Sequence, residues 1–185
     1  MGASRTLPRT LELRRPRLDD ERELLRAHRA TTPEVPNFLH HYREGMPFQR
    51  YLEVLDEQER GVALAPGQVP STFLLACVDE RVVGRVALRH RLTEALTHIG
   101  GHVGYVVVSE FRRRGYATVM LRLALDIARR EFGIDRALVS CDDDNVGSIR
   151  AIERNGGILE NVVTGPDSAT PIRRYWIDTR GRATP

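Results

Sequence analysis

The sequence predicts a single α/β domain. Short stretches dense in β-branched and apolar residues alternate with longer stretches in which apolar residues recur every three or four positions. The length of 185 residues and the hydrophobic content of 41% suit one globular domain with a buried core. The chain contains no internal repeat, so we expect one domain over residues 1–185, with a core at about 10–178 and flexible tails at 1–8 and 179–185.

The first part of the chain predicts one strand and two helices. Apolar and polar residues alternate over Thr10–Arg15, which is typical of a half-buried strand. Asp20 and Glu23 have the spacing of a capping box, which predicts a helix from there to about Thr31. An apolar stripe then predicts a second helix over Pro47–Arg60.

The middle of the chain predicts three strands. Their apolar and β-branched density is typical of buried strands, and the first two are separated by a short polar turn at Asp79–Arg81. The segment Arg91–Gly101 shows no clear periodicity. The predicted strands are Phe73–Val78, Val82–Arg89 and Val103–Val108.

The last part changes to a helical period at Gly115, and Gly133 ends this long helix. A strand, a short helix closed by two glycines and two further strands follow. The chain thus has six or seven strands and about four helices. The last four elements are predicted at Arg136–Cys141, Asn145–Asn155, Ile158–Thr164 and Pro171–Asp178.

Composition excludes several classes of function. All 28 basic residues are arginine, so no lysine can form a Schiff base or serve a Walker motif. The net charge of +3 does not indicate nucleic-acid binding. No apolar run is long enough for a membrane helix, and no secretory signal is present. Cys77 and Cys141 are too far apart for a metal motif, so we interpret them as reduced thiols of a cytoplasmic protein.

The segment Tyr105–Thr118 carries the clearest chemical signal. A buried strand runs into a turn with three arginines, and the turn opens the long helix. The first amides of a helix are unpaired and carry a partial positive charge, which favours phosphate. Gly115 permits close approach of a ligand to the backbone, and arginine can bind phosphate through two nitrogens. The segment therefore predicts a phosphate or diphosphate site; an ordinary turn with surface arginines is the alternative.

These residues resemble the GNAT superfamily of acyltransferases. Its acetyl-CoA signature is Gln/Arg-x-x-Gly-x-Gly/Ala, and Arg112, Gly115 and Ala117 occupy its three fixed positions. A second motif follows about 30 residues later, where Asn145 and Ser148 match the pattern Asn-x-x-Ser on a helix that ends at glycine. The similarity extends over roughly residues 10–178.

The resemblance implies a GNAT fold with a mixed central sheet of six or seven strands. The fourth strand would carry a bulge and splay from the fifth, and acetyl-CoA, as co-substrate, would lie in that gap with no metal. A backbone amide of Val107 or Val108 would polarise the acetyl carbonyl. The residues implied to contact acetyl-CoA are Val106, Val107, Val108, Arg112, Arg113, Arg114, Gly115, Tyr116, Ala117, Thr118, Asn145 and Ser148.

The reaction implied is direct attack of an amine, which needs a base. His102 lies early on the fourth strand, where the family often places such a group, and the ordinary pKa of histidine suits the task. His98 and Glu110 are weaker candidates. Many members place a Tyr seven residues after the motif Asn to protonate the departing thiolate, but Ile152 stands there. Water or another tyrosine would then serve; Tyr175 is a candidate, with sheet packing as its alternative, and we expect Tyr105 in the core.

The resemblance predicts an N-acetyltransferase that acts on a primary amine. The acceptor, a small molecule or a peptide, is not identified by the sequence. The aromatic-rich segment Phe38–Phe48 could form a lid over it or serve only as a hydrophobic cover. The alternative function is a non-catalytic acyl-CoA-binding sensor or regulatory module. We expect no nucleic-acid or membrane partner, and homodimers are common in the family.

Overall fold

The computed structural model describes residues 10–32, 34–35, 38–62, 64–164 and 170–180. The tails expected at 1–8 and from 181 onward lie outside this part of the chain. Thr179 belongs to the packed structure: it is buried, and its hydroxyl donates to the carbonyl oxygen of Ile134 at 2.5 Å. The packed chain therefore reaches one residue beyond the expected core.

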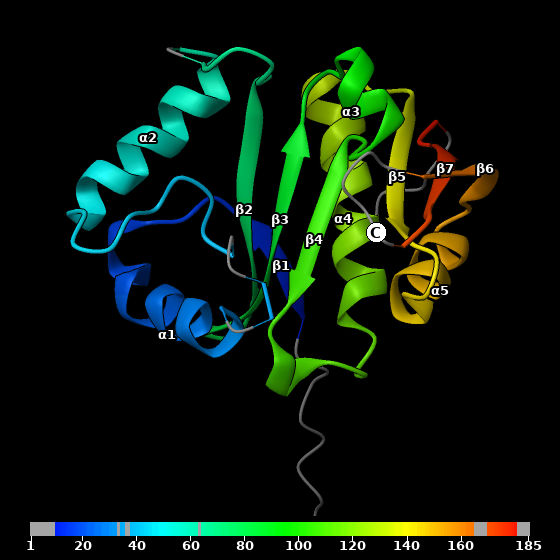
Figure 1. The fold of residues 1–185 in the computed structure, drawn as a ribbon. Coiled ribbons are helices and arrows are strands. Elements are labelled where there is room, and N and C mark those ends of the chain that lie inside the picture. The colour runs from blue at the N-terminus through cyan, green and yellow to red at the C-terminus, as the bar shows by residue number, and fades with distance from the viewer. Residues whose placement is uncertain (1–9, 33, 36–37, 63, 165–169, 181–185) are drawn as a thin grey trace, which may run out of the picture.

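In this part of the chain, seven strands form two antiparallel sheets (Figure 1). The first sheet has the order β1-β2-β3-β4 and the second the order β5-β7-β6. Within each sheet every pair is antiparallel, and an isolated bridge between Gly101 and Val139 lies where the two sheets meet. The strands are β1 (Leu11–Arg14), β2 (Ser71–Val78), β3 (Arg81–Arg89), β4 (Val103–Val107), β5 (Arg136–Asp142), β6 (Ile158–Val163) and β7 (Ile172–Asp178).

The expected number of strands and the splay between β4 and β5 are thus confirmed, whereas the mixed sheet is divided into two parts. The bulge expected in β4 is absent from its pairing with β3, because the register runs from Gly84–Val107 to Leu88–Val103 without a shift. The described irregularities lie instead in β2, between Ala76 and Cys77, and in β6, between Leu159 and Asn161.

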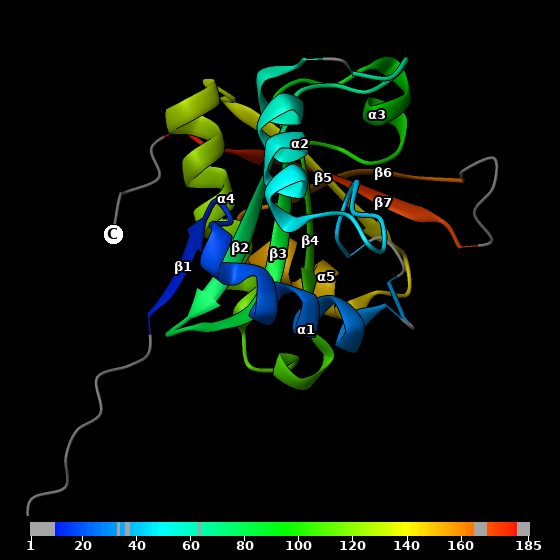
Figure 2. The ribbon, with the colours of Figure 1, turned by 90° about the vertical axis from the view of Figure 1, so that its left-hand side faces the viewer.

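Helices cover both faces of the first sheet. α1 (Glu21–Thr31) and α2 (Phe48–Arg60) lie on one face, as Figure 2 shows from that side. α4 (Tyr116–Phe132) packs on the opposite face and against α5 (Val146–Arg154). Two apolar clusters result, one beneath α1 and α2 and one between α4, the first sheet and β5. Burial of these side chains is the main force that holds the layers together.

The ambiguous segment after β3 folds as a short helix, α3 (Glu94–His98), which Thr93 caps by accepting the amide of Leu96. The expected capping box of α1 is wrong. Asp20 does not cap α1; its carboxylate accepts the backbone amide of Arg17 at 2.7 Å and pairs with Arg14 at 2.6 Å. The carboxylate of Asp20 thus ties β1 to the turn before α1.

Two further predictions from the sequence concern the cysteines and the possibility of a membrane helix. Cys77 is buried and Cys141 half-buried, and both are free thiols. Among the described helices, none is both long and apolar enough to cross a bilayer.

Candidate functional site

The turn between β4 and α4 has the backbone of an anion site. Ser109–Phe111 form one turn of 3-10 helix, and α4 begins after Gly115, whose φ is +83°. Arg113 also adopts a left-handed conformation, with φ of +62°, which few residues other than glycine adopt without cost. A Cβ built on Gly115 would meet no atom within 4 Å, so open space lies directly above this backbone.

The backbone amides at the start of α4 also favour the binding of an anion. The backbone N–H groups of Gly115, Tyr116 and Ala117 donate to no acceptor in the described part of the chain, whereas Thr118 N–H returns to the carbonyl oxygen of Gly115 at 3.1 Å. Unpaired amides and the helix dipole together favour a bound anion. A side chain at position 115 would project into the open space above these amides.

The three arginines of the turn differ in their contacts. Arg112 donates through Nε to the carbonyl oxygen of Val107 at 3.2 Å and forms an ion pair with Glu34. Arg114 donates to the carbonyl oxygen of Glu110 at 3.0 Å and lies 5.6 Å from the centre of the Phe111 ring. Arg113 is exposed and forms no hydrogen bond or ion pair within the described residues. Arg112 therefore supports the turn, and Arg113 is the guanidinium available to a phosphate.

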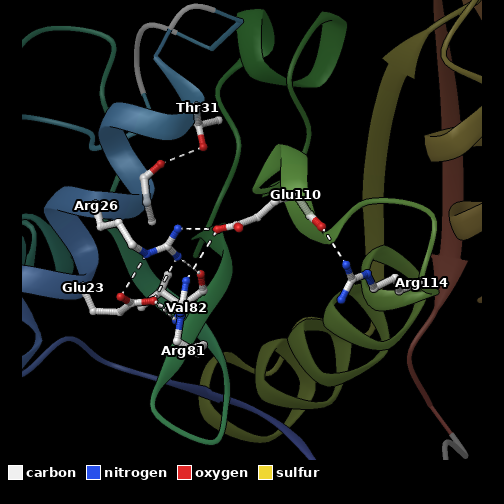
Figure 3. Close-up of polar contacts among 8 residues, drawn as sticks. Glu23, Arg26, Thr31, Arg81, Val82, Glu110 and Arg114 are labelled. Carbon is white, nitrogen blue, oxygen red and sulfur yellow. Dashed lines mark hydrogen bonds and ion pairs between the residues drawn. The ribbon is translucent and has the colours of Figure 1, made fainter.

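An ion-pair network ties this turn to α1 (Figure 3). Glu110 pairs with Arg26 of α1 and lies 3.6 Å from Arg81, and Arg26 in turn pairs with Glu23 at 2.9 Å. Glu23 also accepts the backbone amide of Val82 at 3.1 Å. Glu110, a weak candidate for the base, is thus committed to two guanidinium groups on the outside of the turn.

The segment just before β4 joins the two sheets. His102 N–H donates to the carbonyl oxygen of Leu138 at 2.7 Å, and its imidazole Nδ1 accepts the Leu138 N–H at 2.9 Å. A Cβ on Gly101 would lie 2.4 Å from that same carbonyl oxygen, so only glycine permits this approach. Beyond this junction β4 and β5 are not paired, and the gap between them leads toward the start of α4.

The register of β4 decides which of its amides face the gap. Val108 N–H donates to Val83 at 2.9 Å, and the carbonyl oxygen of His102 accepts from Arg89 at 2.8 Å. Because backbone groups alternate along an antiparallel strand, the even-numbered residues of β4 face β3 and the odd-numbered residues face away from it. Val107 N–H therefore points into the gap, whereas the amides of Val106 and Val108 are committed to β3.

This alternation also brings forward a residue that the sequence did not indicate. The backbone of Tyr105 faces the gap, and its side chain packs with the cluster of α4 and β5. Its hydroxyl is buried and lies beside the Ser148 side chain. Burial raises the pKa of Tyr105 to about 12, although the nearby Ser148 side chain opposes this shift. The phenol thus stays neutral at neutral pH and lies close to the first turn of α5.

The first turn of α5 forms the other wall. Asn145 caps this helix by accepting the Ser148 amide at 3.0 Å. Ser148 is half-buried beside Tyr105. Ile152, at the position where many relatives carry a tyrosine, is fully buried and packs in the core.

The expected catalytic residues are not all at the gap. His102 lies at the junction, but burial lowers its pKa to about 4, so the ordinary pKa on which its role as base rested does not apply. Tyr175 is 1% exposed, and its hydroxyl lies 3.5 Å from Glu153 in the packed layer of β7. His98 is exposed at the end of α3. Among the described residues, no three His, Cys, Asp or Glu side chains are grouped to hold a metal.

The family model described as "Acetyltransferase (GNAT) domain" matches residues 10–158, which is most of the chain. The chain belongs to the GNAT acetyltransferase family. It is therefore an acyltransferase, and acetyl-CoA is its co-substrate, as the signature turn predicted.

Three relatives place this acetyltransferase among others of its fold. An N-alpha-acetyltransferase of Saccharolobus solfataricus is 25% identical over 153 residues, which cover 79% of each chain. The structure of Mycobacterium smegmatis RimJ in complex with CoA-disulfide superposes with a TM-score of 0.66 at 17% identity, covering 91% of this chain and 81% of that one. A Salmonella typhimurium acetyltransferase, described as modifying the N-terminal serine of a 50S ribosomal subunit protein, has a TM-score of 0.65 at 17% identity, covering 91% and 95%.

Proposed function

We propose that this acetyltransferase moves the acetyl group of acetyl-CoA to the α-amine at the N-terminus of a peptide or protein. The observation that carries the proposal is the Val107 amide, which faces a gap that leads to the unpaired amides of α4. The curated relative described as an N-alpha-acetyltransferase supports the class of acceptor.

The binding arrangement follows from the contacts of the turn and of the gap. The amides of Gly115, Tyr116 and Ala117 would hold the coenzyme diphosphate, with Arg113 supplying an exposed positive charge. Thr118 completes this first turn of α4. The pantetheine arm would lie beside β4, between its outward backbone groups and the first turn of α5, where Asn145 and Ser148 stand. Val106 and Val108 would then have a structural role, because their amides pair with β3.

Amine attack on the thioester creates negative charge on the acetyl oxygen. The Val107 N–H is fixed by the strand before the reaction begins, so donation to that oxygen needs no rearrangement. A preplaced donor of this kind contributes about 3 kcal/mol in other acyl transfers. Arg112 helps to set this geometry, because its Nε holds the carbonyl oxygen of the same residue.

The departing sulfur also needs stabilisation, and Tyr105 would supply it in place of the tyrosine missing at Ile152. Its neutral hydroxyl would donate a hydrogen bond to the sulfur as charge develops, with Ser148 beside it. The proton of the attacking amine would pass to water. His102 would act by position, because its neutral imidazole joins the two sheets at the end of the gap.

The test is a turnover assay with acetyl-CoA and a short peptide that begins with a free serine. We expect release of free thiol together with a mass increase of one acetyl group on the peptide. The matched control is the same peptide with its N-terminus formylated and one lysine added, so that the lysine side chain carries its amine. This control should release no thiol above background. Acetyl-CoA binding without thiol release for any amine would instead support the non-catalytic acyl-CoA module.

A further inference from the structure

A polar pocket of about 370 Å³ lies on the α2 side of the first sheet, at the end where β4 begins. It is enclosed by the end of α2, the start of β2, the end of β3, the residue pair His40–His41 and α3. Gln58 of α2 forms part of the wall, and its amide donates to the carbonyl oxygen of Val69 at 2.9 Å. We call this space the basic pocket. Its polar lining includes His40, His41, Gln58, Gln68, Ser71 and Arg89.

The charge of the basic pocket is positive. Arg89 is its charged lining residue, and none of the residues that enclose it is acidic. The guanidinium of Arg89 donates to the carbonyl oxygen of Gly101 at 2.8 Å and forms no ion pair with a carboxylate among the described residues. Arg85, which is 6% exposed, lies four residues earlier on the same face of β3 and adds a second positive charge nearby.

The neighbouring histidine responds to this environment. Burial lowers the pKa of His40 to about 3, and the two guanidinium charges add to the effect. The imidazole is therefore neutral at neutral pH, and it offers a hydrogen bond without a further charge. His41 next to it has a φ of +64°, a conformation that costs free energy and that often marks a binding site.

The backbone links the basic pocket to the gap between β4 and β5, which we call the acyl-transfer gap. Arg89 bonds to both Gly101 and His102, which form the junction at the start of the gap. From His102 to Val107 the strand extends over five residues, or about 17 Å. An extended peptide whose amine lies near Val107 would therefore place its side chains at the pocket roughly three to five residues from the amine.

We propose that the basic pocket binds an acidic side chain of the acceptor, so that the preferred substrate is a peptide with Asp or Glu about three to five residues from its free N-terminus. This inference rests on the proposed function and names its substrate class. A half-buried guanidinium such as that of Arg89 gains most from a carboxylate that can accept two hydrogen bonds. A free amino acid has its carboxylate beside the amine and would not span the distance.

The experiment uses hexapeptides that begin with serine and carry a single glutamate at position 2, 3, 4 or 5, each paired with the glutamine isostere. Two quantities are measured: kcat/KM from thiol release, and the binding of each peptide to the CoA-loaded protein by calorimetry. We expect the glutamate peptide to be preferred by about tenfold or more at one of positions 3 to 5, and we expect added salt to reduce this ratio.

Variants assign the preference to the pocket. Arg89→Gln should bring the glutamate-to-glutamine ratio close to one. Arg91→Gln, which removes an exposed arginine two residues away, should leave the ratio and the rate unchanged. If Arg89→Gln does not fold, Arg85→Met removes the second charge with a side chain of similar length and should lower the same ratio.

The outcomes separate this inference from the proposed function. Turnover of glutamate and glutamine peptides at equal rates, or a preference that survives in Arg89→Gln, overturns the proposed role of the basic pocket while N-terminal acetylation stands. Glutamate-dependent binding without any turnover supports the pocket and rejects the proposed function. Free glutamate acetylated as efficiently as the best peptide overturns the peptide as the source of the carboxylate.

Discussion

His102 and Leu138 hold each other through two hydrogen bonds, one from each backbone amide, at 2.7 and 2.9 Å. The second bond ends on the imidazole of His102 and not on its backbone, so a side chain takes the place of a strand-to-strand contact. Gly101 makes this approach feasible, and on the far side of it β4 and β5 separate. The width of the acyl-transfer gap is therefore set by these three residues.

Replacing Gly101 should weaken the junction more than replacing any glycine in an open turn. In Gly101→Ala the new Cβ would lie 2.4 Å from the Leu138 carbonyl oxygen at a φ of +71°. We expect a loss of about 3 kcal/mol in the free energy of unfolding, measured by urea denaturation. Gly67→Ala is the matched control, because its φ is +82° but no atom lies within 4 Å, and it should cost about 1 kcal/mol. Equal losses in both variants would mean that the junction is not tight.

Stability should depend on pH through His102. Its pKa falls to about 4 in the folded protein, so between pH 6.5 and 4 the unfolded chain binds more protons than the folded one. Stability is fully present above pH 6.5 and is lost as the pH falls toward 4. The loss is on the order of 2 kcal/mol, measured by denaturation at each pH. His102→Asn should flatten this part of the profile; an unchanged slope would assign it to other groups such as His40.

A negative charge at the start of α4 should weaken acetyl-CoA binding. Gly115→Glu places a carboxylate above the unpaired amides, so we expect the KM for acetyl-CoA to rise at least about tenfold. Gly115→Ala controls for backbone strain, since both variants force a Cβ onto a φ of +83° but only one adds charge. Similar KM values in the two variants would contradict the phosphate site.

Removing the Tyr105 hydroxyl should slow the loss of the thiolate. Tyr105→Phe keeps the ring in the core, and we expect kcat to fall about tenfold with little change in the KM for acetyl-CoA. Thioesters with more acidic thiols should be less affected, because their thiolates need less stabilisation. Tyr51→Phe is the control, because its phenol is also buried but lies in the other cluster, beneath α1 and α2. A uniform fall for all thioesters would assign Tyr105 to packing alone.

Much of the fold could be predicted because its signals are local. The helical period ends at Gly133, and the structure ends α4 there with a φ of +64°. The junction could not be predicted, because Gly101 and Leu138 are far apart in the sequence and the segment before Gly101 has no periodicity. The choice between Val107 and Val108 likewise needed the register with β3, which no local pattern contains.

The candidate site also has parts that a local sequence pattern predicts and parts that no local pattern predicts. The signature turn is one continuous segment, so a phosphate site there can be predicted from neighbouring residues, and it stays a prediction. The basic pocket joins Arg89 of β3 to His40 and to Gln58 of α2, and each of these alone has an ordinary structural explanation. The pKa of His102 depends on burial, which the sequence does not give.

The ion pairs around the signature turn have a chemical consequence for a protein that handles activated acetyl groups. Each of their cations is a guanidinium, as in Arg26, Arg81 and Arg112, and the chain contains no lysine at all. A guanidinium stays protonated and does not react with thioesters as a free amine does. The protein therefore offers acetyl-CoA no side-chain amine to acetylate, even where the local concentration of acetyl-CoA is high. The ion-pair network keeps its positive charges through every catalytic cycle.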